Sequence, residues 1–216
     1  MDIEAVYRSQ ADPEKARAMK AYMRDQFEFL GLPTPLRRQL SKPHLVPMAA
    51  PELRQAVEHL WGLPEREFQY FALGLIEKSR KLWAPDLLWT WEWLVTSKSW
   101  WDTVDALASN VVGLHLARFP HQLEVTDRWI ESGNFWLQRT ALLYQLGYRE
   151  KTDSARLFAY IDRVAPSREF FLRKAIGWAL RQYARTDPEA VKSFVLARGD
   201  RLSGLSRREA LKHYST

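Results

Sequence analysis

One small residue recurs at an almost constant interval in this chain and constrains its fold more than any other feature. Ala72, Ala106, Ala141 and Ala175 are separated by 34, 35 and 34 residues, and each lies near the end of the second turn of a helical pattern. Helix pairs at this period stack into an α-solenoid, and a small residue at a recurrent position permits close helix approach. The sequence therefore predicts an all-α solenoid of HEAT-like repeats with a concave face. The shorter helices expected before each alanine are 51–61, 85–96, 121–131 and 153–164.

Helical periodicity extends through nearly all of the sequence. Between Glu65 and Lys81 apolar residues recur at i, i+3 and i+4, and no comparable stretch alternates with period two. Polar residues that accept backbone N–H groups, some of them followed by proline, mark the expected helix N-termini. They are Asp12, Ser99, Asn134, Ser167 and Asp187. We expect a single repeat domain over residues 1–216.

Several classes of protein are excluded by what the chain lacks. It has no cysteine, which rules out disulfide scaffolds, thiolate zinc sites and cysteine nucleophiles. No apolar stretch approaches the ~18 residues of a membrane helix, and the N-terminus does not have the pattern of a signal peptide. There is no glycine-rich phosphate loop, and the histidines show no metal-ligand spacing. We expect a cytoplasmic protein without metal or nucleotide cofactor. The histidines are His44, His59, His115, His121 and His213.

Charge is distributed unevenly along the chain, whose formal net charge is +6. Of the 32 basic and 26 acidic residues, 14 and 15 lie in residues 1–108, which leaves 18 and 11 for residues 109–216. A basic half favours a polyanionic partner, because each lysine or arginine set against a phosphate releases counterions. The alternative is a solvated basic face. The ten tryptophans add to the first interpretation, since indole rings stack on bases and sugars and attract cations.

The helix expected over residues 99–118 carries an unusual pair. Trp101 and Asp105 are four residues apart and share a face beside the apolar stripe of the helix. A structural role would pair Asp105 with a neighbouring arginine, or have it cap a helix, and would pack Trp101 between repeats. The apolar stripe consists of Trp100, Val104, Leu107, Val111 and His115.

Two later repeats add further candidates. Arg139 stands two residues before Ala141, and Trp178 follows one turn after Ala175. If the repeats stack in register, both converge with Trp101 and Asp105 on the concave surface. An aromatic cleft with an arginine and one carboxylate suits a cationic group beside a phosphate chain. Alternatively, Arg139 is only the ion-pair partner of Asp105.

Ordered motifs over about residues 12–212 resemble a known family. The most specific are Ser99-Trp100-Trp101-Asp102-Thr103-Val104-Asp105 and Lys174-Ala175-Ile176-Gly177-Trp178. Others are Phe29-Leu30-Gly31, Leu63-Pro64-Glu65-Arg66-Glu67-Phe68 and Trp136-Leu137-Gln138-Arg139. The sequence is similar in these motifs to the AlkD family of bacterial DNA glycosylases.

The resemblance implies a HEAT-like solenoid that binds duplex DNA in its concave cleft as a monomer. Such enzymes excise cationic N3- and N7-alkylated purines, such as 3-methyladenine and 7-methylguanine, without requiring a pocket for a flipped base. The family's catalytic positions match Asp105, Trp101, Trp178 and Arg139. Its DNA-contacting positions match Tyr22, Thr34, Arg38 and Arg181, whereas Pro33 stands where a polar DNA contact is expected.

Two other functions remain open at this point. A non-catalytic HEAT-repeat protein that binds damaged or branched DNA would have the same fold and charge. A protein-interaction scaffold is the usual role of HEAT arrays, and the basic second half disfavours it. The pairing of Trp101 with Asp105 favours the enzyme. A carboxylate repels the phosphates of DNA, so a protein that only binds DNA would not need one at this place. We expect an enzyme of DNA repair in a bacterial cytoplasm, associated with the nucleoid.

Overall fold

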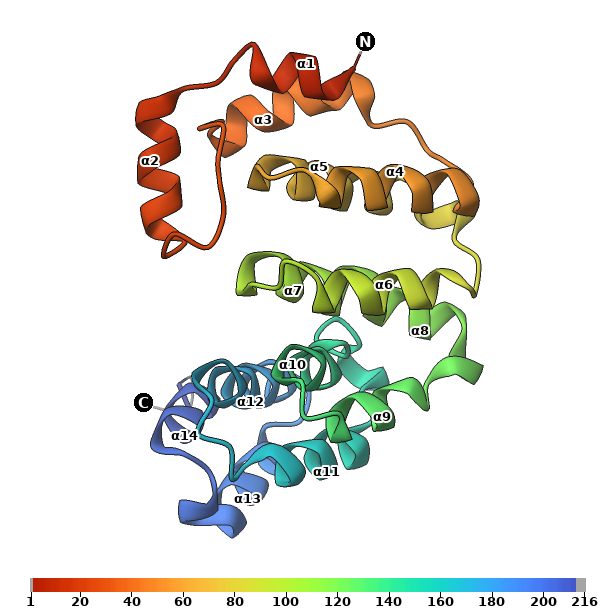
Figure 1. Cartoon of the computed structure of the whole chain (residues 1–216). Coiled ribbons are helices and arrows are strands. Elements are labelled where there is room, and N and C mark those ends of the chain that lie inside the picture. Colours follow the sequence, from red (N-terminus) through yellow and green to blue (C-terminus); the bar gives the residue numbers. More distant parts are fainter. Residues whose placement is uncertain (1, 213–216) are drawn as a thin grey trace. The chain divides into compact units, whose positions relative to one another are not determined.

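The computed structural model describes residues 2–212, and its regular structure there is helical (Figure 1). The one pairing of extended backbone in this range is an isolated parallel bridge between Glu28 and Glu65. The prediction of an all-α chain is confirmed. The α-helices are α1 (Ile3–Arg8), α2 (Pro13–Tyr22), α3 (Thr34–Ser41), α4 (Ala50–Gly62), α5 (Arg66–Lys78), α6 (Leu87–Thr96), α7 (Trp101–Ala106), α8 (Gly113–Arg118), α9 (Val125–Glu131), α10 (Phe135–Leu143), α11 (Ser154–Val164), α12 (Phe170–Tyr183), α13 (Pro188–Arg198) and α14 (Gly204–Ala210).

Contacts divide the chain into two compact units, one ending at Thr90 and the other beginning at Trp91. The single domain expected over residues 1–216 stays a prediction. None of the helices in the described range is long and apolar enough to cross a membrane. His213 lies outside the described residues.

The first unit is built around the antiparallel pair α4 and α5 (Figure 1). The pair forms because both helices bury one face: Leu53, Val57 and Leu60 on α4, and Phe68 and Leu75 on α5. The α5 face also contains Ala72, which is fully buried as its recurrent position predicts. Helix α3 packs against α1, and a buried hydrogen bond of 2.6 Å joins the Tyr7 and Ser41 hydroxyls of this pair.

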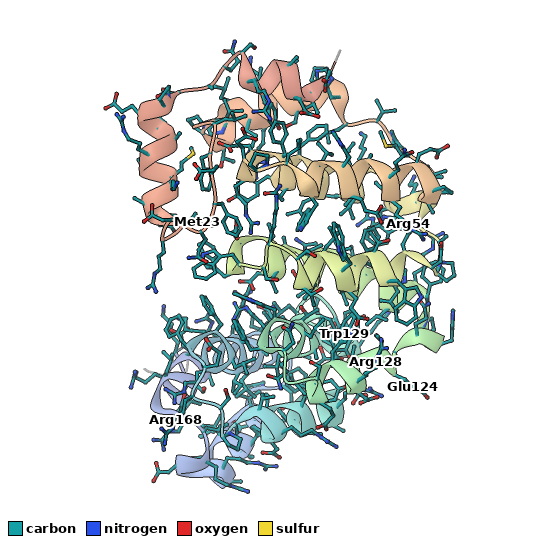
Figure 2. The ribbon with its side chains drawn as sticks, viewed as in Figure 1. Met23, Arg54, Glu124, Arg128, Trp129 and Arg168 are labelled. Atoms are coloured by element: carbon teal, nitrogen blue, oxygen red, sulfur yellow. The ribbon has the colours of Figure 1, made fainter. Side chains whose placement is uncertain are left out.

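The second unit has the layered arrangement expected of helical repeats. Helices α10, α12 and α14 pack successively against one another, and α9, α11 and α13 form a second row beside them (Figure 1). Along α9, Trp129 is buried in the unit, whereas Glu124 before the helix and Arg128 are exposed (Figure 2). The stacking of helix pairs predicted from the repeat is therefore found here, and the HEAT-like character of the repeats stays a prediction.

Side-chain hydrogen bonds in this unit follow the period of the sequence. Thr126 and Tyr160 are 34 residues apart, and Lys174 and Glu209 are 35 residues apart. Such bonds join equivalent positions in neighbouring repeats, so residues about 34 positions apart in the sequence are in contact in the structure. Ala141 and Ala175 are buried at the recurrent position, but Ala106 is only half-buried.

The helix that carries Ala106 changes type directly after this residue. Residues Leu107–Val112 form a π-helical turn inside one continuous helix made of α7, this turn and α8. The N–H of Gly113 donates to the carbonyl of Ala108 five residues earlier. A side chain at Gly113 would collide with the carbonyl oxygen of Tyr144, and the Tyr148 hydroxyl donates to the Gly113 carbonyl at 2.6 Å.

The apolar stripe predicted for this helix is found, with one exception. Val104, Leu107, Val111 and His115 are buried, but Trp100 is half-buried and precedes the first residue of α7. His115 lies in the core, where its Nδ1 accepts a hydrogen bond from the Trp91 indole at 3.1 Å.

Three of the five predicted N-caps are confirmed. The carboxylates of Asp12 and Asp187 and the amide oxygen of Asn134 accept backbone N–H groups of α2, α13 and α10. The other two were wrong. The Ser99 hydroxyl instead donates to the Val95 carbonyl, and Ser167 accepts from the N–H of Glu169, whose own side chain caps α12.

Candidate active site

The two central site residues predicted from sequence form a direct ion pair. Both oxygens of the Asp105 carboxylate accept from the Arg139 guanidinium, Oδ1 from Nε at 2.7 Å and Oδ2 from Nη2 at 2.9 Å. This side-on fork fixes the plane of the carboxylate as well as its position. Of the readings left open for Asp105, pairing with a neighbouring arginine is the one found.

Arg139 also makes a third hydrogen bond, to the backbone of a further repeat. Its Nη1 donates to the Phe171 carbonyl at 2.5 Å, and only 5% of the arginine side chain is exposed. The guanidinium thus connects α7, α10 and α12. The local sequence supports this placement, since Asn134 caps α10 and sets where the helix that carries Arg139 begins.

Asp105 remains accessible despite this pairing. Its side chain is 19% exposed, and Trp101, one turn earlier on α7, is 36% exposed. The Ser109 hydroxyl donates to the Asp105 main-chain carbonyl, so it leaves the carboxylate oxygens alone. The result is an oriented anion at the surface of the unit with an indole on the same helix face.

An aromatic cluster supports the ion pair from α10 and α12. The Phe171 ring lies 4.9 Å from the Trp136 ring and 5.3 Å from the Trp100 ring, measured between centroids. Trp136 in turn contacts Phe135 at 4.6 Å. Because aromatic packing is dense and directional, it holds the carbonyl of Phe171 where Arg139 can reach it.

Trp178 and Arg181 lie together further along α12. They border an open pocket of about 320 Å³ whose other lining residues are Gln182, Arg185 and Lys212. The predicted convergence of Trp178 with Asp105 stays a prediction. Trp178 lies seven residues, or about two turns, after Phe171, whose carbonyl accepts the hydrogen bond from Arg139.

Glu209 on α14 binds two cations of α12. It accepts from Lys174 at 2.9 Å and from Arg181 at 2.6 Å. The hydrogen bond from Lys174 is the main reason that the pKa of Glu209 lies below its ordinary value. The approach of α14 is close at this point, because a side chain at Gly177 would collide with the Cβ of Glu209.

The remaining predicted residues belong to the first unit. Tyr22 is the last residue of α2 and is 73% exposed. Thr34 and Arg38 are exposed and lie four residues apart on α3, so they share a helix face. Pro33 precedes α3 as its N-cap, without a side-chain capping bond.

The residue that positions α3 was not identified from sequence. Glu67 on α5 is buried, and its carboxylate accepts the backbone N–H groups of Leu30, Gly31 and Leu32 at 2.9–3.1 Å. Gly31 has φ +86°, and a side chain there would collide with the Asp12 backbone. Both residues lie in motifs that carried the family resemblance, and these motifs were the available signal.

A site for a metal ion needs several ligating side chains close together. Residues 2–212 contain no group of three or more His, Cys, Asp or Glu side chains arranged to hold one.

Two comparisons with known proteins point to the same family. Residues 3–214 match the family model of DNA alkylation repair enzymes. The structure is similar to a protein described as a predicted DNA alkylation repair enzyme from Enterococcus faecalis, with 35% sequence identity and a TM-score of 0.87. That match covers 96% of this chain and 98% of the other. No curated protein matches the sequence. This chain belongs to the family of DNA alkylation repair enzymes.

Proposed function

We propose that this protein is a DNA N-glycosylase that excises cationic N3- and N7-alkylated purines, such as 3-methyladenine and 7-methylguanine, from duplex DNA. The family implies a role in DNA repair and DNA as the partner. The observation that carries the finer proposal is the Asp105 carboxylate, oriented by the buried Arg139 fork and still exposed beside Trp101.

The chemistry of the substrate determines what the protein must supply. Alkylation at N3 or N7 leaves the purine positively charged, which makes it a good leaving group. As the glycosidic bond breaks, positive charge develops on the deoxyribose. A fixed carboxylate stabilises that charge and can orient the attacking water. Asp105 is the residue proposed for this role.

Trp101 and Trp178 are proposed to bind the cationic sugar and base. The face of an indole ring carries negative charge density, so it attracts cations, and tryptophan does so more strongly than other aromatic residues. Because this stabilisation acts on charge, neutral lesions would gain little from it. The proposed mechanism requires no flipped base, and bulky cationic adducts would be accepted.

Arg139 is proposed to position the carboxylate. A carboxylate that can rotate must lose that freedom at each reaction, whereas one held by a bidentate arginine is already oriented. Backbone contacts to the duplex are proposed for Tyr22, Thr34, Arg38 and Arg181. We further propose that the protein acts as a monomer in the bacterial cytoplasm, associated with the nucleoid.

The test is release of 7-methylguanine from a duplex oligonucleotide under single-turnover conditions. Wild type is expected to release the base, and Asp105→Asn is expected to lower the rate roughly 100- to 1000-fold while retaining DNA binding. Asp102→Asn, which makes the same change one turn earlier on α7, is the matched control. Equal melting temperatures would exclude unfolding as the cause of a loss.

A second function has one observation in its favour. The Arg139 fork neutralises Asp105, so the carboxylate repels DNA less than an unpaired one would. A non-catalytic protein that binds damaged or branched DNA could therefore keep the same pair. No base release by wild type, together with salt-sensitive binding to DNA, would favour this function and contradict the glycosylase.

A further inference from the structure

One face of α12 continues past the proposed catalytic tryptophan as a row of cations. Lys174, Trp178, Arg181 and Arg185 follow one another at intervals of four, three and four residues. This spacing places them along one side of the helix and of the turn that follows Tyr183. Cations near a helix C-terminus are stabilised by the helix dipole, which favours Arg181 and Arg185 there.

The pocket beside Trp178 is lined by three cations and no carboxylate. Arg181, Arg185 and Lys212 line it together with Trp178 and Gln182. Arg185 lies in the turn after α12, and Lys212 follows α14, so two segments distant in sequence contribute charge to one cavity. A pocket of this composition attracts an anion.

The three cations are not equivalent. Arg181 is engaged by Glu209, which also holds Lys174. Within residues 2–212, neither Arg185 nor Lys212 has an acidic partner within 4.0 Å. Glu209 compensates the charge of Arg181. The remaining positive charge of the pocket therefore lies mainly on Arg185 and Lys212.

A phosphate diester fits these features better than other anions. An arginine fork matches the geometry of phosphate oxygens, and a lysine ammonium adds a point charge from another direction. Trp178 lines the same pocket, and indole rings stack on bases and sugars. The pocket of about 320 Å³ is open, as access by a polymer requires.

We propose that Arg185 and Lys212, beside Arg181, form a subsite for a backbone phosphate of the DNA strand that Trp178 contacts. This inference rests on the proposed action on duplex DNA, and it adds two residues to those expected to touch the duplex. Arg181 and Arg185 lie 10 and 14 residues after Phe171, so the subsite would anchor the strand about three to four turns from the carbonyl that accepts from Arg139.

The experiment measures binding of an undamaged duplex, by fluorescence anisotropy, over a range of salt concentrations. Each lost phosphate contact lowers the slope of log affinity against log salt by about 0.9. Arg185→Gln and Lys212→Gln are each expected to lower it by about this amount, and the double variant by about twice as much. Lys192→Gln, an exposed lysine of α13 outside the pocket, is the matched control and should leave the slope unchanged.

Slopes equal to wild type in both variants would overturn the subsite. So would an equal decrease in Lys192→Gln, because the effect would then be one of overall charge. The readout does not depend on excision, so the two proposals can fail separately. If wild type releases 7-methylguanine but Arg185→Gln and Lys212→Gln keep its slope, the subsite falls and the glycosylase stands. If the slopes change but no base is released, the glycosylase falls and the subsite stands. A wild type that binds no duplex would overturn both.

Discussion

The two units each contain a carboxylate on a helix, and the two carboxylates have opposite environments. In the first unit Glu67 is 1% exposed and is satisfied by three backbone N–H groups of the loop before α3. In the second unit the Asp105 side chain is 19% exposed and is held by one arginine fork. Glu67 accepts from the backbone of a loop and is closed to solvent, whereas Asp105 is oriented by a side chain and stays partly exposed to solvent.

The difference shows how a carboxylate's role can be read from its partners. Three backbone N–H groups occupy most of the hydrogen-bond acceptor sites of Glu67 and connect a loop to α5, which is a structural role. A side-on guanidinium leaves part of the acceptor capacity of Asp105 available to a cation outside the protein. Burial alone would have favoured Glu67 as the candidate acid, whereas the hydrogen-bond donors favour Asp105 for the proposed role.

The largest effect is expected when the bidentate hydrogen bonding of Arg139 to Asp105 is removed and the positive charge is kept. Arg139→Lys retains a cation but cannot make the three hydrogen bonds to Asp105 and Phe171. We expect the free energy of unfolding to fall by about 2–4 kcal/mol, since bonds to charged groups are lost. Excision should slow at least roughly tenfold at temperatures where the variant is folded, since Asp105 loses its orientation.

Arg173→Lys is the control for that variant, because the Arg173 guanidinium donates through Nε to one carbonyl, that of Ser167. It should leave excision unchanged. Urea unfolding and single-turnover release would be measured for both. Wild-type values of both quantities in Arg139→Lys would contradict a positioning role for the fork.

The next prediction concerns Glu67, the buried carboxylate of the first unit. Glu67→Gln replaces one accepting oxygen by an amide donor that faces the N–H groups of Leu30, Gly31 and Leu32. The free energy of unfolding should fall by about 1–3 kcal/mol, and the excision rate of the folded protein should not change. Glu58→Gln, on the exposed side of α4, controls for the loss of charge. A loss of excision with unchanged stability would assign Glu67 to the reaction.

Alkaline pH tests the packing behind the helix that carries Asp105. Burial raises the pKa of Tyr148 to about 12, and its hydroxyl donates to the Gly113 carbonyl. Since the pKa is about 10 in the unfolded chain, this contribution is complete below pH 10 and is lost as the pH rises toward 12.

Tyr148→Phe should therefore cost about 1 kcal/mol at neutral pH and make unfolding less sensitive to pH above 10. Burial also raises the pKa of Tyr160 to about 12, so some sensitivity should remain. Urea titrations at pH 7 to 11 provide the measurement, with Tyr22→Phe, which removes an exposed hydroxyl, as control. An unchanged alkaline slope in Tyr148→Phe would contradict this account.

The smallest effect is expected at a third carboxylate, which is paired with two cations. Glu209→Gln keeps the contact of its Cβ with α12 but releases Lys174 and Arg181. Stability should change by less than about 1 kcal/mol, because Glu209, Lys174 and Arg181 are all partly exposed to solvent, which screens their interaction. Affinity for undamaged duplex should rise several-fold at low salt, because two more cations become available. A fall in affinity would show that Glu209 instead presents Arg181 to the DNA.

Acid should weaken the interaction of Glu209 with Lys174 and Arg181, as the Glu209→Gln substitution does. The folded pKa of Glu209 is lowered, so the stability that the pair contributes is present above the ordinary glutamate pKa of about 4.3 and is lost as pH falls through the lower folded value.

Much of the fold and part of the site could be predicted from the sequence. The spacing of alanines gave the interval of the repeats, and Asp105 and Arg139 are themselves 34 residues apart, which is why their pairing could be considered in advance. Asn134 was identified as a cap because an asparagine before an apolar helix has few other uses. These features follow from periodicity and from local chemistry.

Other features could not be predicted because they depend on tertiary contacts. Arg66 and Glu67 lie in a helical pattern where charged residues usually face solvent, and both are buried. The bond from Arg139 to the Phe171 carbonyl involves a backbone atom, which every residue has, so no residue type signals it. Ser99 and Ser167 have the chemistry of N-caps, but their hydroxyls found other partners.

The π turn at Leu107–Val112 has a consequence for how this protein can change over evolution. It separates the part of the helix that carries Trp101 and Asp105 from the part that fills the core with His115 and Leu116. The turn accommodates one residue more than an α-helix of the same rotation, so loss of one residue from it would restore a regular α-helix and leave the relative rotation of these two parts nearly unchanged. The direction in which the carboxylate faces is therefore buffered against a one-residue deletion at this place, whereas the same deletion in a regular α-helix would rotate the two parts by about 100°.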